Sequence, residues 1–147
     1  MNDMTYIKQA LELAEKGAAL GEVPVGAVIV KNGQIVAKAH NERELLPDAT
    51  AHAELLAIRR ACAVLGTNRL TGCTLYVTLE PCPMCAGAIV NARIDRVVFG
   101  AYDARGGACG SLIRIQKYPL YFMPEFVGGV LEQECAAILT EFFASKR

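Results

Sequence analysis

The sequence lacks an excess of charge of either sign and lacks any long apolar run. Fifteen lysines and arginines balance fifteen aspartates and glutamates over 147 residues, so the formal net charge is zero. No overall basic surface therefore points to a nucleic acid, and any polyanion must be met by a local patch. No stretch reaches the roughly 18 apolar residues that a membrane-spanning helix needs. The first residues also lack the continuous apolar core of a signal peptide, and we expect a cytoplasmic protein without a membrane partner.

The sequence also lacks internal repeats, low-complexity tracts and any sign of a second domain. Its 147 residues, of which 53% are hydrophobic, are enough to bury the core of one domain. We therefore expect a single domain over residues 1–147. In the cytosol the cysteines stay reduced, and metal binding or burial explains them better than disulfides. They are Cys62, Cys73, Cys82, Cys85, Cys109 and Cys135.

Hydrophobic periodicity predicts an alternation of helices and strands. Apolar residues recur at intervals of three and four from Met4 to Leu20, which predicts an amphipathic helix. The runs "VPVGAVIV" and "IVAKAH" are predicted strands, joined by the hairpin signal Asn32-Gly33. The later predicted elements are a helix over 51–65, a strand over 73–80, a helix over 82–94, a strand over 96–101, a short strand or turn over 125–130 and a helix over 131–143.

The order of these elements predicts a mixed sheet with helices on both faces. Strand, helix and strand between residues 75 and 100 imply a parallel right-handed crossover, whereas the earlier hairpin is antiparallel. We therefore expect an α/β fold, a three-layer α/β/α sandwich around roughly five strands. Asp48 or Thr50 is the expected N-cap of the helix near residue 51, and Pro81 an expected first-turn residue of the next helix.

Two short motifs lie at the starts of these two helices. "AHAE" contains His52 and Glu54, and "PCPMC" contains Cys82 and Cys85. The crossover brings both helix starts to the same edge of the sheet. A catalytic zinc takes three protein ligands and keeps one open position, and a neutral imidazole with cysteine thiolates is a preferred ligand set. The helix N-terminus also favours the thiolates, and Glu54 is placed to take a proton from an activated water and hand it on.

Each motif alone has a structural explanation. A C-x-x-C pair is often half of a structural zinc site or two buried thiols, and H-x-E at a helix start is common by chance. A four-ligand structural zinc would need one of the other cysteines (Cys62, Cys73, Cys109 or Cys135), none of which lies in a second C-x-x-C motif. Together, H-x-E followed by P-C-x-x-C forms the known signature of zinc-dependent nucleobase deaminases. The combination therefore favours a catalytic zinc over a structural one.

Longer stretches resemble one deaminase family. "GEVPVGAVIV", "TAHAELLAIR", "RLTGCTLYVTLEPCPMCAGAIVNARIDRVVFGAYDARGGACGS" and "ECAAILTEFF" are similar to the tRNA-specific adenosine deaminases, and the similarity runs from about Tyr6 to Phe143. That family converts adenosine to inosine at the wobble position of an anticodon. The resemblance implies a cytidine-deaminase-like fold, a homodimer, one zinc ion per subunit and the tRNA anticodon loop as the partner.

The resemblance also implies roles for individual residues. The matching positions are His52, Cys82 and Cys85 for the metal ligands, Glu54 for the proton shuttle, Asn41 for a hydrogen bond to the target base, and Val23 and Val25 for the wall of the base pocket. Without the resemblance, Asn41 would be interpreted as a turn residue and the two valines as core residues.

Two of the chain's departures from the family bear on the substrate. Tyr121-Phe122, within "YPLYFMPEF", stands where the family generally has an Asn-His pair in a region that contacts the RNA loop, and the short end "FFASKR" offers only Lys146 and Arg147 as basic residues. A deaminase of a free base such as guanine, cytosine or a related heterocycle needs no phosphate groove and is the alternative hypothesis. A non-catalytic zinc-stabilised binding module is a third, against which Glu54 argues because a structural site does not require that carboxylate.

Overall fold

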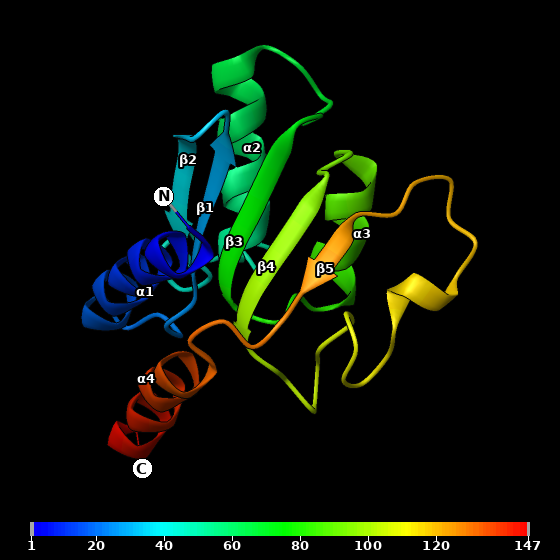
Figure 1. The fold of residues 1–147 in the computed structure, drawn as a ribbon. Helices are drawn as coiled ribbons and strands as arrows, with labels where there is room; N and C mark the ends of the chain where they lie inside the picture. Colours follow the sequence, from blue (N-terminus) through cyan, green and yellow to red (C-terminus); the bar gives the residue numbers. More distant parts are fainter. Residues whose placement is uncertain (1, 147) are drawn as a thin grey trace.

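The computed structural model describes residues 2–146 and shows one five-stranded sheet between two layers of helices (Figure 1). The elements in chain order are α1 (Asp3–Ala19), β1 (Gly26–Lys31), β2 (Gln34–His40), α2 (Ala53–Leu65), β3 (Cys73–Leu79), α3 (Pro83–Asn91), β4 (Arg96–Ala101), the 3-10 helix η1 (Ile115–Lys117), β5 (Glu125–Val127) and α4 (Glu132–Ser145). The strand order is β2-β1-β3-β4-β5. β1 pairs antiparallel with β2 and β3, whereas β4 pairs parallel with β3 and β5. The predicted three-layer sandwich with a mixed sheet is therefore confirmed.

The two faces of the sheet carry separate hydrophobic cores because β1 is buried on both sides. Ala27 and Ile29 face the core under α2 and α3, while Val28 and Val30 face the core under α1 and α4. Successive strand residues point to opposite faces, so a strand between two helical layers is apolar throughout. The hairpin between β1 and β2 turns at Asn32 and Gly33, whose φ angles of 52° and 75° are those that its turn chemistry predicts. Within residues 2–146, no helix combines the length and the apolar character needed to cross a membrane.

The starts of α2 and α3 differ from the prediction. The prediction of Asp48 or Thr50 as the N-cap is wrong, because His52 is the N-cap and Asp48 accepts hydrogen bonds from the Thr50 amide and hydroxyl in the preceding turn. Similarly, Cys82 is the N-cap of α3 and Pro83, rather than Pro81, is its first residue. The candidate ligands therefore lie at the junction of loop and helix.

An ion-pair cluster ties the start of α1 to the sheet. Arg96 of β4 donates to both carboxylate oxygens of Asp3 at 2.9 and 2.7 Å, and to Glu125 of β5 at 2.8 Å. The hydroxyl of Tyr76 on β3 donates to Asp3 at 2.9 Å. The hydrogen bonds from Arg96 are the main cause that lowers the pKa of Asp3, while burial and the contact with Asp3 raise the pKa of Tyr76 to about 12. One carboxylate thus connects α1 with β3 and β4.

We expect Asp3→Asn to lower the free energy of unfolding by about 1 kcal/mol at neutral pH, because the pair is partly exposed and only the charge is lost. Since the folded state lowers the pKa of Asp3 from its usual 3.8, its contribution is complete above that value and is lost as the pH falls through the folded-state pKa. Urea unfolding of both proteins should show a constant difference near neutral pH that shrinks in acid. A difference that stays undiminished at about pH 2 would contradict this account.

Candidate metal centre

The starts of α2 and α3 bring the three predicted ligands together. Nδ1 of His52 lies 3.7 Å from Sγ of Cys82 and 3.6 Å from Sγ of Cys85, and all three ligand atoms lie within 4.8 Å of one another. A tetrahedral zinc ion with ordinary bond lengths would hold its nitrogen and sulfur ligands about 3.6 Å apart. The three side chains therefore fit such an ion without rearrangement.

The local sequence explains why the two cysteines face the same point. Cys82 is the N-cap of α3, and Cys85 lies three residues later, above it on the same side of the first turn. Cys85 is fully buried, whereas Cys82 and His52 are partly buried. Among residues 2–146, no further cysteine, histidine or carboxylate joins this cluster, which argues against a four-ligand structural site. The cysteines that stay outside it are Cys62, Cys73, Cys109 and Cys135.

The contact between the two cysteine side chains shifts their pKa values in opposite directions. The thiol of Cys85 donates to Cys82, and this contact, followed by the one from His52, lowers the pKa of Cys82 to about 4. The same contact raises the pKa of Cys85, whose proton stabilises its neighbour. The hydrogen bond with Cys82 is also the main cause that raises the pKa of His52. A divalent cation at this point would bind both cysteines as thiolates, since metal ligands must be deprotonated.

A pocket of about 160 Å³ opens beside this cluster, and we call it the metal pocket. Its volume is below the roughly 300–1,000 Å³ of typical small-molecule sites, so it suits a ligand as small as one nucleobase. Glu54, in the first turn of α2, is only 4% exposed, and burial raises its pKa to about 7. A carboxyl group of that pKa is suited to take up and release a proton near neutral pH. The pocket is lined by Val23, Val25, Asn41, Arg43, His52, Glu54, Leu79, Glu80, Cys82 and Asp103.

Asn41 has a fixed orientation in this pocket. The backbone N–H of Ala53 donates to Oδ1 of Asn41 at 2.8 Å, and because a backbone N–H can only donate, the atom facing it must be the oxygen. Oδ1 thus caps the start of α2, where His52 makes no capping hydrogen bond. The amide NH₂ of Asn41 is left to donate toward the pocket.

Sequence reasoning missed four residues that line the metal pocket: Arg43, Leu79, Glu80 and Asp103. Leu79 and Glu80 precede the cysteine motif directly. Asp103 follows the end of β4, and the parallel pairing of β3 and β4 carries it to the edge of the sheet where Cys82 lies. The predicted crossover was therefore a signal that could have found Asp103.

Tyr121 and Phe122 lie away from the metal pocket. The Tyr121 hydroxyl donates to Asn91 at 2.8 Å, and the guanidinium of Arg93 lies 4.3 Å from the centre of the Tyr121 ring and 5.5 Å from that of Phe122. Asn91 ends the nine-residue helix α3, whose opposite end carries Cys82, so about 13 Å of helix separates the two places. The replacement of the family's Asn-His pair therefore leaves the chain's own metal pocket unchanged.

A groove of about 410 Å³ adjoins the metal pocket, and we call it the outer groove. The two share Val23, Asn41 and Arg43 as a common wall. The groove is completed by Gly21, Glu22, Glu44, Phe142 and Lys146. Arg147, the other expected basic residue, lies outside the described residues.

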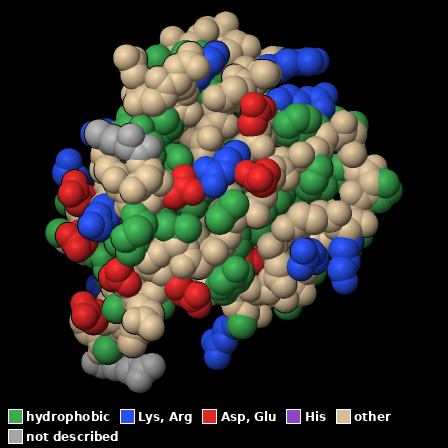
Figure 2. Space-filling model, in the orientation of Figure 1, with side chains coloured by type: hydrophobic (Ala, Val, Ile, Leu, Met, Phe, Trp, Pro, Cys, Tyr) green, Lys and Arg blue, Asp and Glu red, His purple; other side chains and the backbone are tan. Residues whose placement is uncertain are grey.

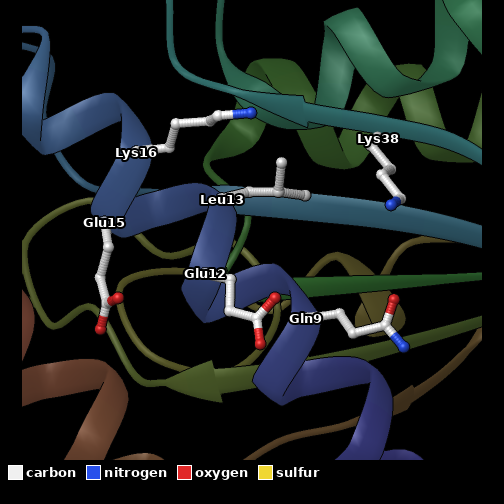
Figure 3. Close-up of a pocket in the computed structure, with 6 residues that line it drawn as sticks. All are labelled: Gln9, Glu12, Leu13, Glu15, Lys16 and Lys38. Carbon is white, nitrogen blue, oxygen red and sulfur yellow. The ribbon is translucent and has the colours of Figure 1, made fainter.

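Among residues 2–146, no second cluster of metal-ligating side chains is present. A hollow of about 520 Å³ between α1 and β2 is larger than the metal pocket, but its charged groups, such as Glu12 and Lys38, are of both signs and belong to the surface (Figure 3). On the face covered by α1 and α4, acidic and basic side chains are likewise interspersed (Figure 2). The candidate metal ligands and the buried carboxyl group of Glu54 thus lie together at the starts of α2 and α3.

Comparison with known proteins agrees with this geometry. Residues 1–147 match the model of the MafB19-like deaminase family. The chain is 53% identical to the tRNA-specific adenosine deaminase of Bacillus subtilis over 146 residues, which cover 99% of the chain and 91% of that protein. It is 46% identical to the tRNA-specific adenosine deaminase of Agrobacterium fabrum, over 97% of the chain and 94% of that protein.

Solved structures show the same likeness. A structure from a study of A-to-I editing by tRNA:A34 deaminases has a TM-score of 0.89 and 46% identity, over 92% of this chain and 99% of that one. A guanine deaminase from Bacillus subtilis has a TM-score of 0.67 and 35% identity, over 99% of this chain and 94% of that one. The fold therefore occurs with more than one deaminase substrate.

We expect Cys82→Ala to lower the metal content of the purified protein from about one ion to less than about 0.1 ion per chain, because two ligands cannot hold the ion tightly. Elemental analysis measures this directly. Cys62→Ala is the matched control, since Cys62 also lies in the layer of α2 and α3 but outside the cluster, and it should keep the full metal content. An unchanged content in Cys82→Ala would remove that residue from the ligand set.

Proposed function

Because this chain belongs to the tRNA-specific adenosine deaminase family, we propose that it is a zinc-dependent hydrolytic deaminase that converts adenosine to inosine at the wobble position of a tRNA. One observation carries the proposal for the site: a single small pocket is lined by His52, Cys82 and the buried carboxyl group of Glu54, and Cys85 lies beside it as the third member of the ligand cluster. A structural metal site would need neither the pocket nor the carboxylate.

The metal ligands and Glu54 have separate roles in the proposed reaction. His52, Cys82 and Cys85 would hold the zinc ion, which supplies the Lewis acidity that makes a water molecule easier to deprotonate. Glu54 takes a proton from this water as the oxygen adds to C6 of the adenine ring, and delivers it to the ring nitrogen beside C6. Glu54 then transfers the second proton of the water to the exocyclic amine, the C6–N bond breaks and ammonia leaves. Adenosine and water thus give inosine and ammonia.

Three further residues bind the base in this proposal. The NH₂ group of Asn41 donates to an acceptor atom of the ring, in an orientation that Ala53 fixes through Oδ1. Val23 and Val25 form the apolar wall against which the ring packs. The small volume of the pocket supports the binding of a base that has been turned out of its stack.

The outer groove supports an RNA substrate. A nucleotide within a chain needs space for its sugar and phosphates beside the base, and the outer groove opens directly from the metal pocket. Arg43 and Lys146 place positive charges in it beside the acidic Glu22 and Glu44, of which Glu22 is occupied by the backbone amides of Glu44 and Leu45, and Phe142 gives it an aromatic surface. Such a combination suits a single-stranded nucleic acid, whose phosphates and bases need both kinds of contact.

The remaining parts of the proposal follow from the family. We propose one zinc ion per subunit, a single domain over residues 1–147, a homodimer and a cytoplasmic location. Val64 of α2 and Met84 of α3 are exposed apolar residues on the two helices that begin at the metal pocket, and they offer part of a surface for a second copy.

A free-base deaminase is the second candidate. The likeness to a guanine deaminase and the small pocket favour it, since a free purine needs the metal pocket alone. The pair Tyr121-Phe122, of which Tyr121 is exposed and Phe122 is partly buried, gives no support to either candidate within one chain, because it lies at the far end of α3.

We expect the zinc-loaded protein to form inosine in an anticodon stem-loop RNA and to release little ammonia from free guanine, cytosine or adenine. Glu54→Ala should keep its zinc and lose about 1,000-fold in rate, because only the proton transfer is removed. Inosine is measured by nucleoside analysis of the digested RNA, and ammonia by a coupled assay. Rapid turnover of a free base without inosine in the RNA would reverse the assignment of the substrate.

Asn41→Asp tests how the base is recognised. One carboxylate oxygen can still accept from Ala53, so fold and zinc content should be kept, while the other presents an acceptor where the amide presents a donor. We expect kcat/KM on the stem-loop RNA to fall by about 100-fold, as for the loss of a buried hydrogen bond combined with repulsion. A loss of less than about threefold would show that Asn41 does not contact the base through this group.

A further inference from the structure

Glu80 is a buried carboxylate that the proposed reaction does not use. It follows the last residue of β3, is 2% exposed, and makes no ion pair with a lysine or arginine of residues 2–146. Its charge is instead satisfied by donors from the loop after β4. The Asp103 amide donates to Oε1 at 3.0 Å, together with the Ser111 hydroxyl, while the amides of Cys109 and Ser111 donate to Oε2 at 2.9 and 3.0 Å.

The loop over residues 102–111 is shaped around this carboxylate. A Cβ atom at Gly107 would overlap the carboxyl group of Glu80, so only glycine allows the loop to pass there. The Ala108 amide donates to the carbonyl oxygen of Pro81 at 2.8 Å, which attaches the loop to the segment that leads into Cys82. Glu80 therefore occupies the centre of the loop as an acceptor for its backbone.

This arrangement meets the metal pocket at two residues, Glu80 itself and Asp103. Asp103 lines the pocket, and its amide is the first of the backbone donors that Glu80 holds. Asp103 also accepts hydrogen bonds from the amides of Arg105 and Gly106, so its own side chain is fixed by the same loop. On the basis of the proposed function, we propose that Glu80 is a positioning residue that fixes Asp103 at the mouth of the metal pocket for binding of the RNA substrate.

The pattern of donors makes Glu80→Gln a selective test. If the new NH₂ group took the place of Oε2, it would face two backbone amides, neither of which can accept a hydrogen bond. In the place of Oε1 it faces the Asp103 amide and the Ser111 hydroxyl, and the hydroxyl can rotate to accept. The glutamine should therefore adopt this second orientation, which leaves the Asp103 amide alone without an acceptor.

The experiment measures backbone amide exchange by NMR on the zinc-loaded protein. In Glu80→Gln we expect the Asp103 amide to exchange about 10-fold faster, while the amides of Cys109 and Ser111 change by less than about twofold. Zinc content should stay unchanged. On the stem-loop RNA, KM should rise about fivefold while kcat changes by less than about twofold, because Glu54 and the ligands are held by other elements.

Ser111→Ala is the matched control. It removes the hydroxyl donor to the same Oε1 atom but leaves the acceptor for the Asp103 amide, so that amide and KM should both stay near wild type. Equal acceleration of all three amides, an unchanged Asp103 amide, or loss of zinc in Glu80→Gln would overturn the proposal. If the wild-type protein formed no inosine, the proposed function would fail on its own, whereas the pattern of amide exchange would still decide whether Glu80 holds Asp103.

Discussion

The site depends on two helices that begin at the same edge of the sheet with ligand side chains at their N-cap positions. An N-cap side chain normally accepts a hydrogen bond from the first turn, but His52 and Cys82 make no such bond, because both are directed at a common point. The absence of these capping hydrogen bonds is compensated differently in the two helices. In α2, Asn41 reaches from the end of β2 to accept the Ala53 amide, whereas α3 begins with Pro83, which has no amide to satisfy. The structure thus frees both caps for metal binding without leaving the helix starts unsupported.

Three buried glutamates lie around the metal pocket, and the role of each depends on the groups that it contacts. Glu80 accepts backbone amides of the loop over 102–111, and Glu22 accepts the amides of Glu44 and Leu45 in the loop after β2. Both loops contribute to the pocket walls, so the two carboxylates act as fixed centres around which irregular backbone is ordered. Glu54 faces the pocket instead, and burial raises its pKa toward neutrality. Three buried residues of one type therefore have different tasks, because their neighbours differ.

Much of this arrangement could be predicted from local pattern. The layers, the crossover and the grouping of His52, Cys82 and Cys85 follow from periodicity, since each depends on spacing within one element or on the handedness of one connection. The N-caps could not be predicted in this way, because Asp48 accepts hydrogen bonds from Thr50 in the preceding turn instead, and the Asn41 contact spans two elements. The hydrogen bond from the Asp103 amide to Glu80 could not be predicted either. It joins residues 23 positions apart, which come together only at the edge of the assembled sheet.

The metal pocket alone does not distinguish between an RNA substrate and a free base. Its volume accommodates one nucleobase, and a zinc ion held by the candidate ligands would act together with Glu54 on any ring amino group, so adenosine and free-base deaminases can share such a pocket. Discrimination must therefore come from groups that meet the rest of a nucleotide. Arg43 lies on the wall common to the metal pocket and the outer groove, while Lys146 and Phe142 line the groove beyond it. A free base would leave these groups in water, whereas an RNA strand would bring a phosphate and a neighbouring base to them. We therefore expect the preference between these substrates to depend on the outer groove more than on the metal pocket.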